Sequence, residues 1–174
     1  MRIRKHGGLV DVNSDGSIII RPWTSKAVTI DGDFAQTGQT TQNGVIKKSV
    51  QVPLTAAQII AMGTTPVSLI AAPGAGLAII VDNITFKMTR TATAFTGGGA
   101  VEFRYTDASG AKVSADVAAA VVTTGGAGVE FSNVRGIEAA ITPVANAAIV
   151  IRNPTAAFAA GTGTAVVSID YHIV

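Results

Sequence analysis

The chain has 174 residues, of which 48% are apolar and 14% are charged, whereas about 25% of residues are charged in an average globular domain. Its formal net charge of +2 argues against a protein that binds nucleic acid through many phosphate contacts. The absence of cysteine excludes disulfides and thiol catalysis. A weakly charged surface is typical of a protein whose outer faces are covered by partners.

The charge is unevenly distributed along the chain. Residues 1–50 contain seven basic and four acidic residues, and residues 51–174 contain six and seven. Both a basic arm that reaches an acidic surface and a solvated terminus fit this distribution. The first ten residues, MRIRKHGGLV, lack the continuous apolar region of a secretory signal, and no run has the roughly 18 apolar residues of a membrane helix. We therefore expect a soluble protein that is made in a cytoplasm and has no membrane partner.

The first candidate element is the stretch DVNSDGSI at 11–18, which matches the start of a calcium-binding loop. Asp11, Asn13 and Asp15 would supply oxygens and Gly16 the turn, but position 12 of the loop is Pro22, which has no side-chain oxygen. The following SIII is strand-forming where a calcium loop would lead into a helix. The stretch therefore predicts a β-hairpin over residues 9–21, closed by NSDG. No metal site is expected here.

An extended N-terminal arm is predicted over residues 1–45. The segment SKAVTIDGDFAQTGQTTQNG at 25–44 has few large apolar residues, as in a linker. A two-stranded hairpin is only marginally stable by itself, so we expect the hairpin to add to another sheet, in its own domain or in a partner. The globular domain is predicted to cover residues 46–174.

Eight strands are predicted in this domain, separated by glycine-rich turns. At 101–106, Val101, Phe103 and Tyr105 alternate with polar residues, which is the period of a half-buried strand. With no long helical pattern, the fold class predicted is all-β, an antiparallel β-sandwich of jelly-roll type. The predicted strands are 45–52, 66–72, 77–90, 100–106, 112–118, 129–134, 147–153 and 164–174.

One short helix is predicted within PLTAAQIIAMG at 53–63. Thr55 and Gln58 have the spacing of a capping box, and Gly63 is the expected stop. The glycine-rich APGAGLAIIV at 72–81 lacks the lysine of a phosphate-binding loop and leads into a strand, so it predicts a β-turn.

No catalytic motif is present. The sequence lacks G-x-S-x-G, G-x-x-x-x-G-K-[ST] and H-E-x-x-H, and the acidic residues of the domain are scattered singly. His6 and His172 have no second histidine or cysteine near them, so a zinc site is not expected, and His172 is predicted to lie on a sheet surface. We expect no catalytic residues, no cofactor, no metal and no enzymatic activity. The few aromatic residues weaken the interpretation as a sugar-binding protein without removing it.

The domain resembles a module of tailed-bacteriophage virion proteins. The resemblance is carried by LTAAQI, TPVSLIAAPGAG, TAFTGGG and FRYTDASG within residues 52–114, and it continues more loosely to VVSIDYHIV at the end of the chain. These motifs are turn and strand patterns of moderate specificity. Residues 1–45 lie outside the resemblance.

The resemblance implies a structural role in a virion, as a decoration or cement protein that binds the major capsid protein on the outer capsid surface. Self-association is also implied, and we expect a trimer. The alternatives are a tail, neck or head-fibre component that presents the domain to a host, and a carbohydrate-active enzyme or lectin. The residues predicted to contact a partner are Arg2, Arg4, Lys5, Ile18, Ile19, Ile20 and Trp23.

Overall fold

The computed structural model describes residues 2–5, 8–12, 18–22, 40–42, 45–106, 109–135 and 141–174, with side chains over 47–106, 109–134 and 141–174. The chain forms two compact units, one within Met1–Gly38 and one within Gln39–Val174. The second unit begins before the predicted boundary at 45/46, because β4 (Thr40–Gln42) pairs with the start of β5 (Val45–Leu54).

The N-terminal unit contains a three-stranded antiparallel sheet in the order β1-β2-β3. Its strands are β1 (Arg2–Lys5), β2 (Gly8–Val12) and β3 (Ile18–Pro22). Strands β2 and β3 pair with each other, as the predicted hairpin requires, whereas the turn at 13–17 lies outside the described residues. The sequence analysis treated Arg2–Lys5 as extended arm, but this segment pairs along β2. The register places Ile3, Val10 and Ile20 opposite one another across the three strands.

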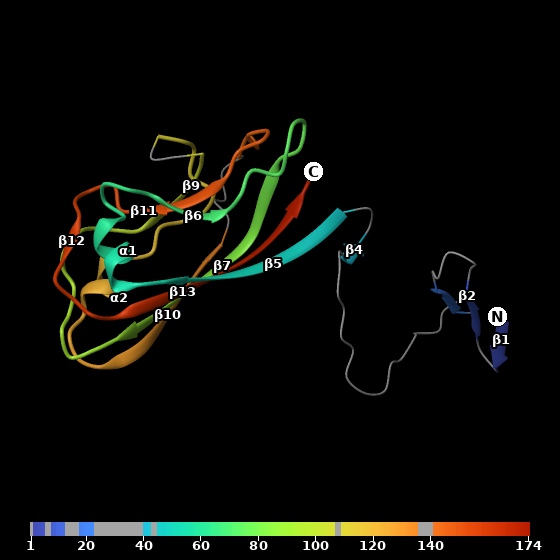
Figure 1. Cartoon of the computed structure of the whole chain (residues 1–174), viewed down its shortest axis with the longest axis horizontal. Helices are drawn as coiled ribbons and strands as arrows, with labels where there is room; N and C mark the ends of the chain where they lie inside the picture. Colours follow the sequence, from blue (N-terminus) through green and yellow to red (C-terminus); the bar gives the residue numbers. More distant parts are fainter. Residues whose placement is uncertain are drawn as a thin grey trace. The chain divides into compact units, whose positions relative to one another are not determined.

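The second unit is an antiparallel β-sandwich (Figure 1). Its larger sheet has five strands in the order β10-β7-β13-β5-β4, and its smaller sheet has three in the order β6-β11-β9. The strands not yet given are β6 (Val67–Ile70), β7 (Ile79–Arg90), β9 (Glu102–Tyr105), β10 (Gly128–Arg135), β11 (Ile149–Arg152) and β13 (Thr164–Ile173).

Short elements close one end of the sandwich. Helices α1 (Ala56–Ala61) and α2 (Ala119–Thr123) lie at this end together with the two-stranded sheet of β8 (Thr96–Gly97) and β12 (Phe158–Ala159). The C-terminus lies at the opposite end (Figure 1). The helices are connectors and do not form a layer of the fold.

The core lies between the two sheets, where alternate strand residues point inward. Val101, Phe103 and Tyr105 are buried as the alternation predicts, and so are Val167 and Ile169 of β13. The Tyr105 hydroxyl donates a 2.5 Å hydrogen bond to the carbonyl oxygen of Ile79. This bond joins the smaller sheet to the larger one, and burial of the ring raises the pKa of Tyr105.

The all-β, antiparallel prediction is confirmed, and the jelly-roll subtype stays a prediction. Seven of the eight predicted strands are present, with ends that differ by up to two residues. The predicted strand at 112–118 is wrong, because only Lys112 and Val117 form bridges with the neighbouring strand. The β-turn predicted within residues 72–81 is confirmed by a 3.2 Å hydrogen bond from the Leu77 amide to the Gly74 carbonyl oxygen.

The predicted helix begins as its sequence requires. Thr55 is the N-cap, the Gln58 amide donates to its hydroxyl oxygen over 3.3 Å, and the Thr55 amide donates to Gln58 Oε1 over 2.9 Å. Gly63 follows the last turn, but its role is close packing. A Cβ added at Gly63 would lie 2.7 Å from the backbone of Ala157, next to β12. The glycine thus allows two backbone segments to touch.

Replacing Gly63 by alanine is expected to lower the free energy of unfolding by about 2 kcal/mol, because overpacking at a backbone contact forces one segment to move. Urea unfolding of the full chain measures this loss. Gly125→Ala is the matched control, since a Cβ there meets no atom within 4 Å, and its stability should stay unchanged or rise by up to about 1 kcal/mol. Equal losses in the two variants would contradict the packing explanation.

Candidate interaction surfaces

The outer face of the larger sheet carries small polar residues with little charge. One row across the strands is Asn133, Thr85, Ser168 and Gln51, and the next is Phe131, Lys87, Val166 and Pro53. Phe131 is 64% exposed, and the Lys87 Nζ atom lies 5.7 Å from the centre of its ring, within the range of a cation–π contact. This face offers an exposed aromatic side chain with a lysine beside it.

Strand β10 has its more apolar side facing solvent. Val129 and Phe131 are exposed, whereas Glu130 and Ser132, which alternate with them, are only partly exposed. Glu130 Oε2 lies 3.3 Å from Arg90 Nη1, so its charge is paired within the domain. A half-buried strand ordinarily has the opposite pattern, with the apolar residues inside.

A cluster of Asp82, Lys47 and His172 lies on the same face, on three adjacent strands. The pairing of β7 with β13 shifts between Asp170 and Tyr171, and this bulge leaves Asp82 without a partner in the register and exposes it. Lys47 Nζ donates to Asp82 Oδ2 over 2.8 Å, and His172 Nδ1 lies 2.9 Å from Asp82 Oδ1. Burial works against ionisation of Asp82, but the hydrogen bonds and charges of Lys47 and His172 outweigh it and hold the pKa of Asp82 below its ordinary value.

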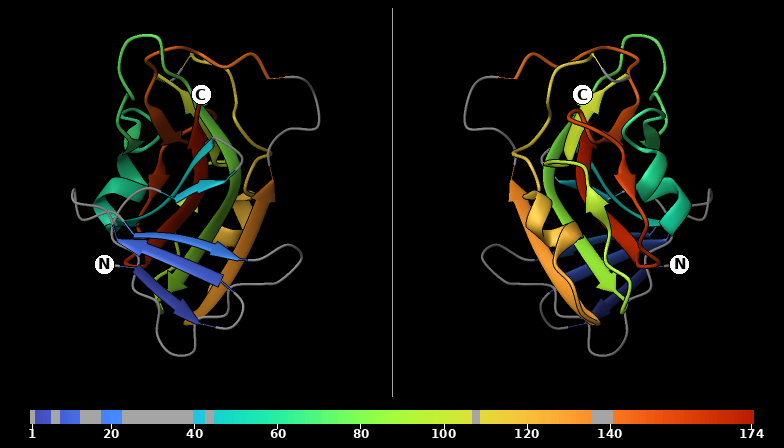
Figure 2. Two further views of the ribbon diagram at one scale, coloured as in Figure 1. Left: turned by 90° about the vertical axis from the view of Figure 1, so that its right-hand side faces the viewer. Right: turned by 90° about the vertical axis from the view of Figure 1, so that its left-hand side faces the viewer.

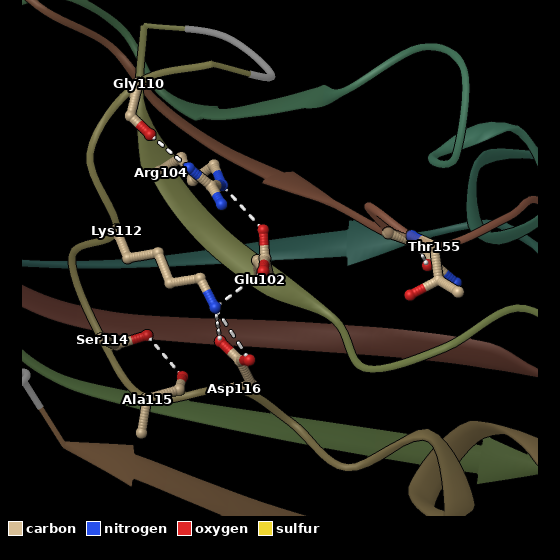
Figure 3. A network of polar contacts seen from close by, with 9 residues as sticks. Glu102, Arg104, Gly110, Lys112, Ser114, Ala115, Asp116 and Thr155 are labelled. Carbon is tan, nitrogen blue, oxygen red and sulfur yellow. Dashed lines mark hydrogen bonds and ion pairs between the residues drawn. The ribbon is translucent and has the colours of Figure 1, made fainter.

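A second polar network covers the outer face of β9 (Figure 3). The Glu102 side chain is only 7% exposed, and its carboxylate accepts from Arg104 Nε and from Lys112 Nζ, both over 2.7 Å. Arg104 Nη1 also donates to the Gly110 carbonyl oxygen over 2.6 Å, and Lys112 reaches Asp116 over 2.9 Å. Burial works against ionisation of Glu102, but these cations hold its pKa below the ordinary value. The network fastens the segment 109–117 to the smaller sheet.

The end of the sandwich opposite the helices exposes several apolar side chains. Leu77, Val144 and Val174 are exposed there, and backbone bonds from Asn146 to Leu77 and between Ala78 and Val174 hold these segments together. An open hollow of about 320 Å³ lies at this end, with Ile79, Tyr171 and Ile173 in its wall and Lys48 at its side. The loops here are tied to the sheet by main-chain bonds.

Within the described parts of the chain, no three His, Asp or Glu residues gather to hold a metal ion. No helix of these parts is long and apolar enough to cross a membrane. His172 lies on the outer sheet surface, as predicted, where its Nδ1 atom contacts Lys47 and Asp82.

The predicted partner residues of the N-terminal unit occupy two different faces. Alternate residues of a strand fall on opposite faces, so the register places Arg2, Arg4 and Ile19 on one face and Lys5, Ile18 and Ile20 on the other. Trp23, like His6, lies outside the described residues. The structure therefore brings these residues together in two groups.

The sequence analysis missed Val129 and Phe131. Their alternation with Glu130 and Ser132 was visible in VEFSNV, but alternation does not say which face is buried. The pairing with β7 decides that question, since it places Val129 beside Thr89 and Phe131 beside Lys87 on the outer face of the sheet.

No protein-family profile matches the chain, and no curated protein matches it. Among solved structures, it is similar to a chain of the cyanophage Pam1 capsid asymmetric unit. The two are 16% identical with a TM-score of 0.40, and the similarity covers 86% of this chain and 99% of the other. At this level the comparison does not identify a family for the chain.

Proposed function

We propose that this protein is a non-enzymatic structural component of a phage virion that binds the outer surface of the capsid and bridges neighbouring capsomers. The observation that carries the proposal is the division into two compact units. Two separate units can contact two sites on a lattice, which a cement protein needs. The resemblance of residues 52–114 to phage virion modules supports the same role.

The N-terminal sheet supplies the unit that would meet the capsid. Its border strands β1 and β3 have no further partner strand in the described part of the chain, so either can add to a strand at the edge of a coat-protein sheet. The register places Arg2, Arg4 and Arg21 on one face together with Asp11, and the excess positive charge of this face would meet acidic groups of the shell. Such charge pairs orient the complex and speed association more than they raise affinity.

The sandwich supplies the second contact, through its weakly charged outer surfaces. The hydrogen bonds that tie its loops to the sheets make it a rigid spacer. When both units bind one lattice, the second contact forms at high effective concentration, so weak contacts add up to firm attachment. The role requires no catalytic group, and we expect no turnover by the isolated protein. Self-association would multiply the contacts further.

The test is binding of two proteins to purified capsids: the full chain, and a truncation that starts at Gln39. Starting there keeps β4, which pairs with β5. We expect the truncation to bind at least about tenfold more weakly, because one of two linked contacts is lost. Thermal unfolding of the truncation, compared with the full chain, serves as the control for folding. A correctly folded truncation that binds capsids as tightly as the full chain would overturn the proposed role of the N-terminal sheet.

Electron microscopy of the particle separates the capsid role from the alternatives. Density for this chain over the whole head supports the decoration role. Density at the tail, neck or head fibres, together with binding to cells or polysaccharide, would replace it with a host-attachment role. Sugar turnover by the purified chain would contradict the non-enzymatic proposal.

A further inference from the structure

The borders of the two sheets are protected to different degrees. The border of β9 is covered by the segment 111–117, through bonds between Val101 and Val117 in both directions and from Val113 to Phe103. At the far border of the larger sheet, β4 pairs with only the first residues of β5, and the remainder of β5 contains Lys48 and Pro53. Lysine and proline are the residues that commonly block strand addition at an edge.

Strand β10 has none of these protections. It is eight residues long, it borders the sheet (Figure 2), and no segment of the described chain pairs with its outer side. It contains no lysine or proline, and its inward-facing Glu130 is neutralised by Arg90. A border strand of this kind presents unpaired amide and carbonyl groups to another chain.

The side chains of β10 also indicate a partner. Phe131 is 64% and Val129 53% exposed, on the same face of the strand. Large exposed apolar side chains beside an open strand border are typical of a surface that is covered in the assembled protein. The strand therefore offers both backbone groups and apolar side chains to one occupant.

We propose that β10 pairs antiparallel with β10 of a second copy of this chain, about a twofold axis that passes through Phe131. A twofold axis perpendicular to the sheet keeps the outer faces of both copies on the same side. Each outward-facing residue must therefore lie opposite an outward-facing residue of the partner, and each inward-facing residue opposite an inward-facing one. With the axis at Phe131, the two phenyl rings face each other, Val129 faces Asn133, and Glu130 faces Ser132. The two five-stranded sheets become one continuous sheet across the dimer.

The chemistry of the strand selects this register over its neighbours. With the axis at Glu130, two carboxylates would face each other directly, which is destabilising. With the axis at Ser132, Phe131 would face Asn133 and the aromatic pair would be lost. With the axis at Phe131, Lys87, which contacts the ring within each copy, flanks the aromatic pair on both sides. Cross-strand aromatic pairs are among the stabilising pairs in sheets.

This contact is a property of the free protein and does not depend on capsid binding, so it is tested in solution without capsids. The chain has no cysteine. A single cysteine introduced into the full chain can therefore form a disulfide only with the same residue of another copy. Under mild oxidation, Phe131→Cys is expected to form a covalent dimer, since opposed residues of an antiparallel pair have Cα atoms about 4.5–5.5 Å apart, within disulfide range. Non-reducing electrophoresis measures the yield.

Val129→Cys is the matched control, on the same strand and the same face. In the proposed register residue 129 of one copy faces residue 133 of the other. The two residues 129 are therefore offset by four residues along the strand, about 13 Å, which is beyond disulfide range. A high yield at 131 and a low yield at 129 supports the pairing. Equal yields at the two positions, or no dimer at 131, would overturn it.

A second variant tests the energetics of the same contact. Sedimentation of the full chain should show a concentration-dependent dimer. Phe131→Lys should weaken this dimer by about tenfold or more, because two like charges then face each other across the axis. Val144→Lys makes the same change at the apolar end of the sandwich and should leave the dimer intact. A wild-type chain that stays monomeric, or a dimer that survives Phe131→Lys, would refute the proposal.

Discussion

Replacing Phe158 by alanine is expected to lower the free energy of unfolding of the sandwich by about 3–5 kcal/mol. Phe158 is 1% exposed and packs edge-to-face against Phe95, with ring centres 6.3 Å apart. The pair fills the end of the sandwich where β8 and β12 meet. Loss of the ring leaves a cavity that the surrounding backbone cannot fill. Urea unfolding of the full chain, followed by circular dichroism, measures the change.

Two glycines of the TAFTGGG motif provide a second test of the packing around Phe158. Gly98 has φ of +68°, and a Cβ there would lie 2.3 Å from the Phe158 ring. Gly98→Ala should therefore destabilise the domain through a steric clash as well as through the left-handed backbone, and part of this loss should vanish when Phe158 is also alanine. Gly97→Ala is the control. Its φ of +67° is similar, but its Cβ would lie 3.5 Å from the nearest atom. A Gly98→Ala loss that is as large in the Phe158→Ala variant as in the wild type would contradict this explanation.

Local pattern predicts the buried faces of the strands well. The alternation at 101–106 places Val101, Phe103 and Tyr105 inside, as observed, because one buried face of a strand fixes a period of two. The capping box of Thr55 and Gln58 is also as predicted, since it depends only on residues within one turn. Features set by short-range geometry could thus be derived from the sequence.

Features that depend on distant segments could not be derived. The stretch at 112–118 has strand-like composition, but Lys112 and Asp116 join the network around Glu102 and the segment stays irregular. The bulge at Asp82 interrupts a long apolar strand, and only the register with β13 shows it. Residues of β1 were expected in an extended arm because the sequence showed the hairpin of β2 and β3 but not the pairing of β1 with β2.

The candidate surfaces also combine features that the sequence predicts with features that depend on distant segments. Charge counts indicated a basic N-terminal segment, but they could not separate Arg2 and Arg4 from Lys5, which the register puts on opposite faces. The open border at β10 could not be found from sequence, because it results from the order of five strands. Phe131 is an ordinary strand residue in the sequence and becomes a candidate contact only through this order.

Replacing Glu102 by glutamine is expected to lower the free energy of unfolding by about 3 kcal/mol at neutral pH, the lower end of the range for breaking a buried ion pair. The carboxylate accepts from both Arg104 and Lys112, which remain 20% and 33% exposed and so keep some hydration. Glutamine has nearly the same shape, but its amide group would direct a donor toward one of these cations. Chemical unfolding at neutral pH measures the loss.

Asp116→Asn is the matched control, because Asp116 also binds Lys112 but is 36% exposed. Exposed pairs contribute about 0–1 kcal/mol, so this variant should lose less than about 1 kcal/mol. Comparable losses from Asp116→Asn and Glu102→Gln would show that burial of Glu102 is not the source of its effect.

The difference between wild type and Glu102→Gln should also depend on pH in a defined direction. The neighbouring cations hold the pKa of Glu102 below its ordinary value of 4.5 despite burial. A carboxylate with a lowered pKa in the folded state stabilises that state fully above the ordinary pKa, and this contribution is lost as the pH falls through the folded pKa. The Asp82 carboxylate belongs to a separate cluster with Lys47 and His172 and is present in both proteins, so its contribution cancels in the comparison. The stability difference measured at about pH 7 should therefore narrow by about pH 3, and a difference that stays constant over this interval would show that the charge of Glu102 does not hold the segment 109–117 in place.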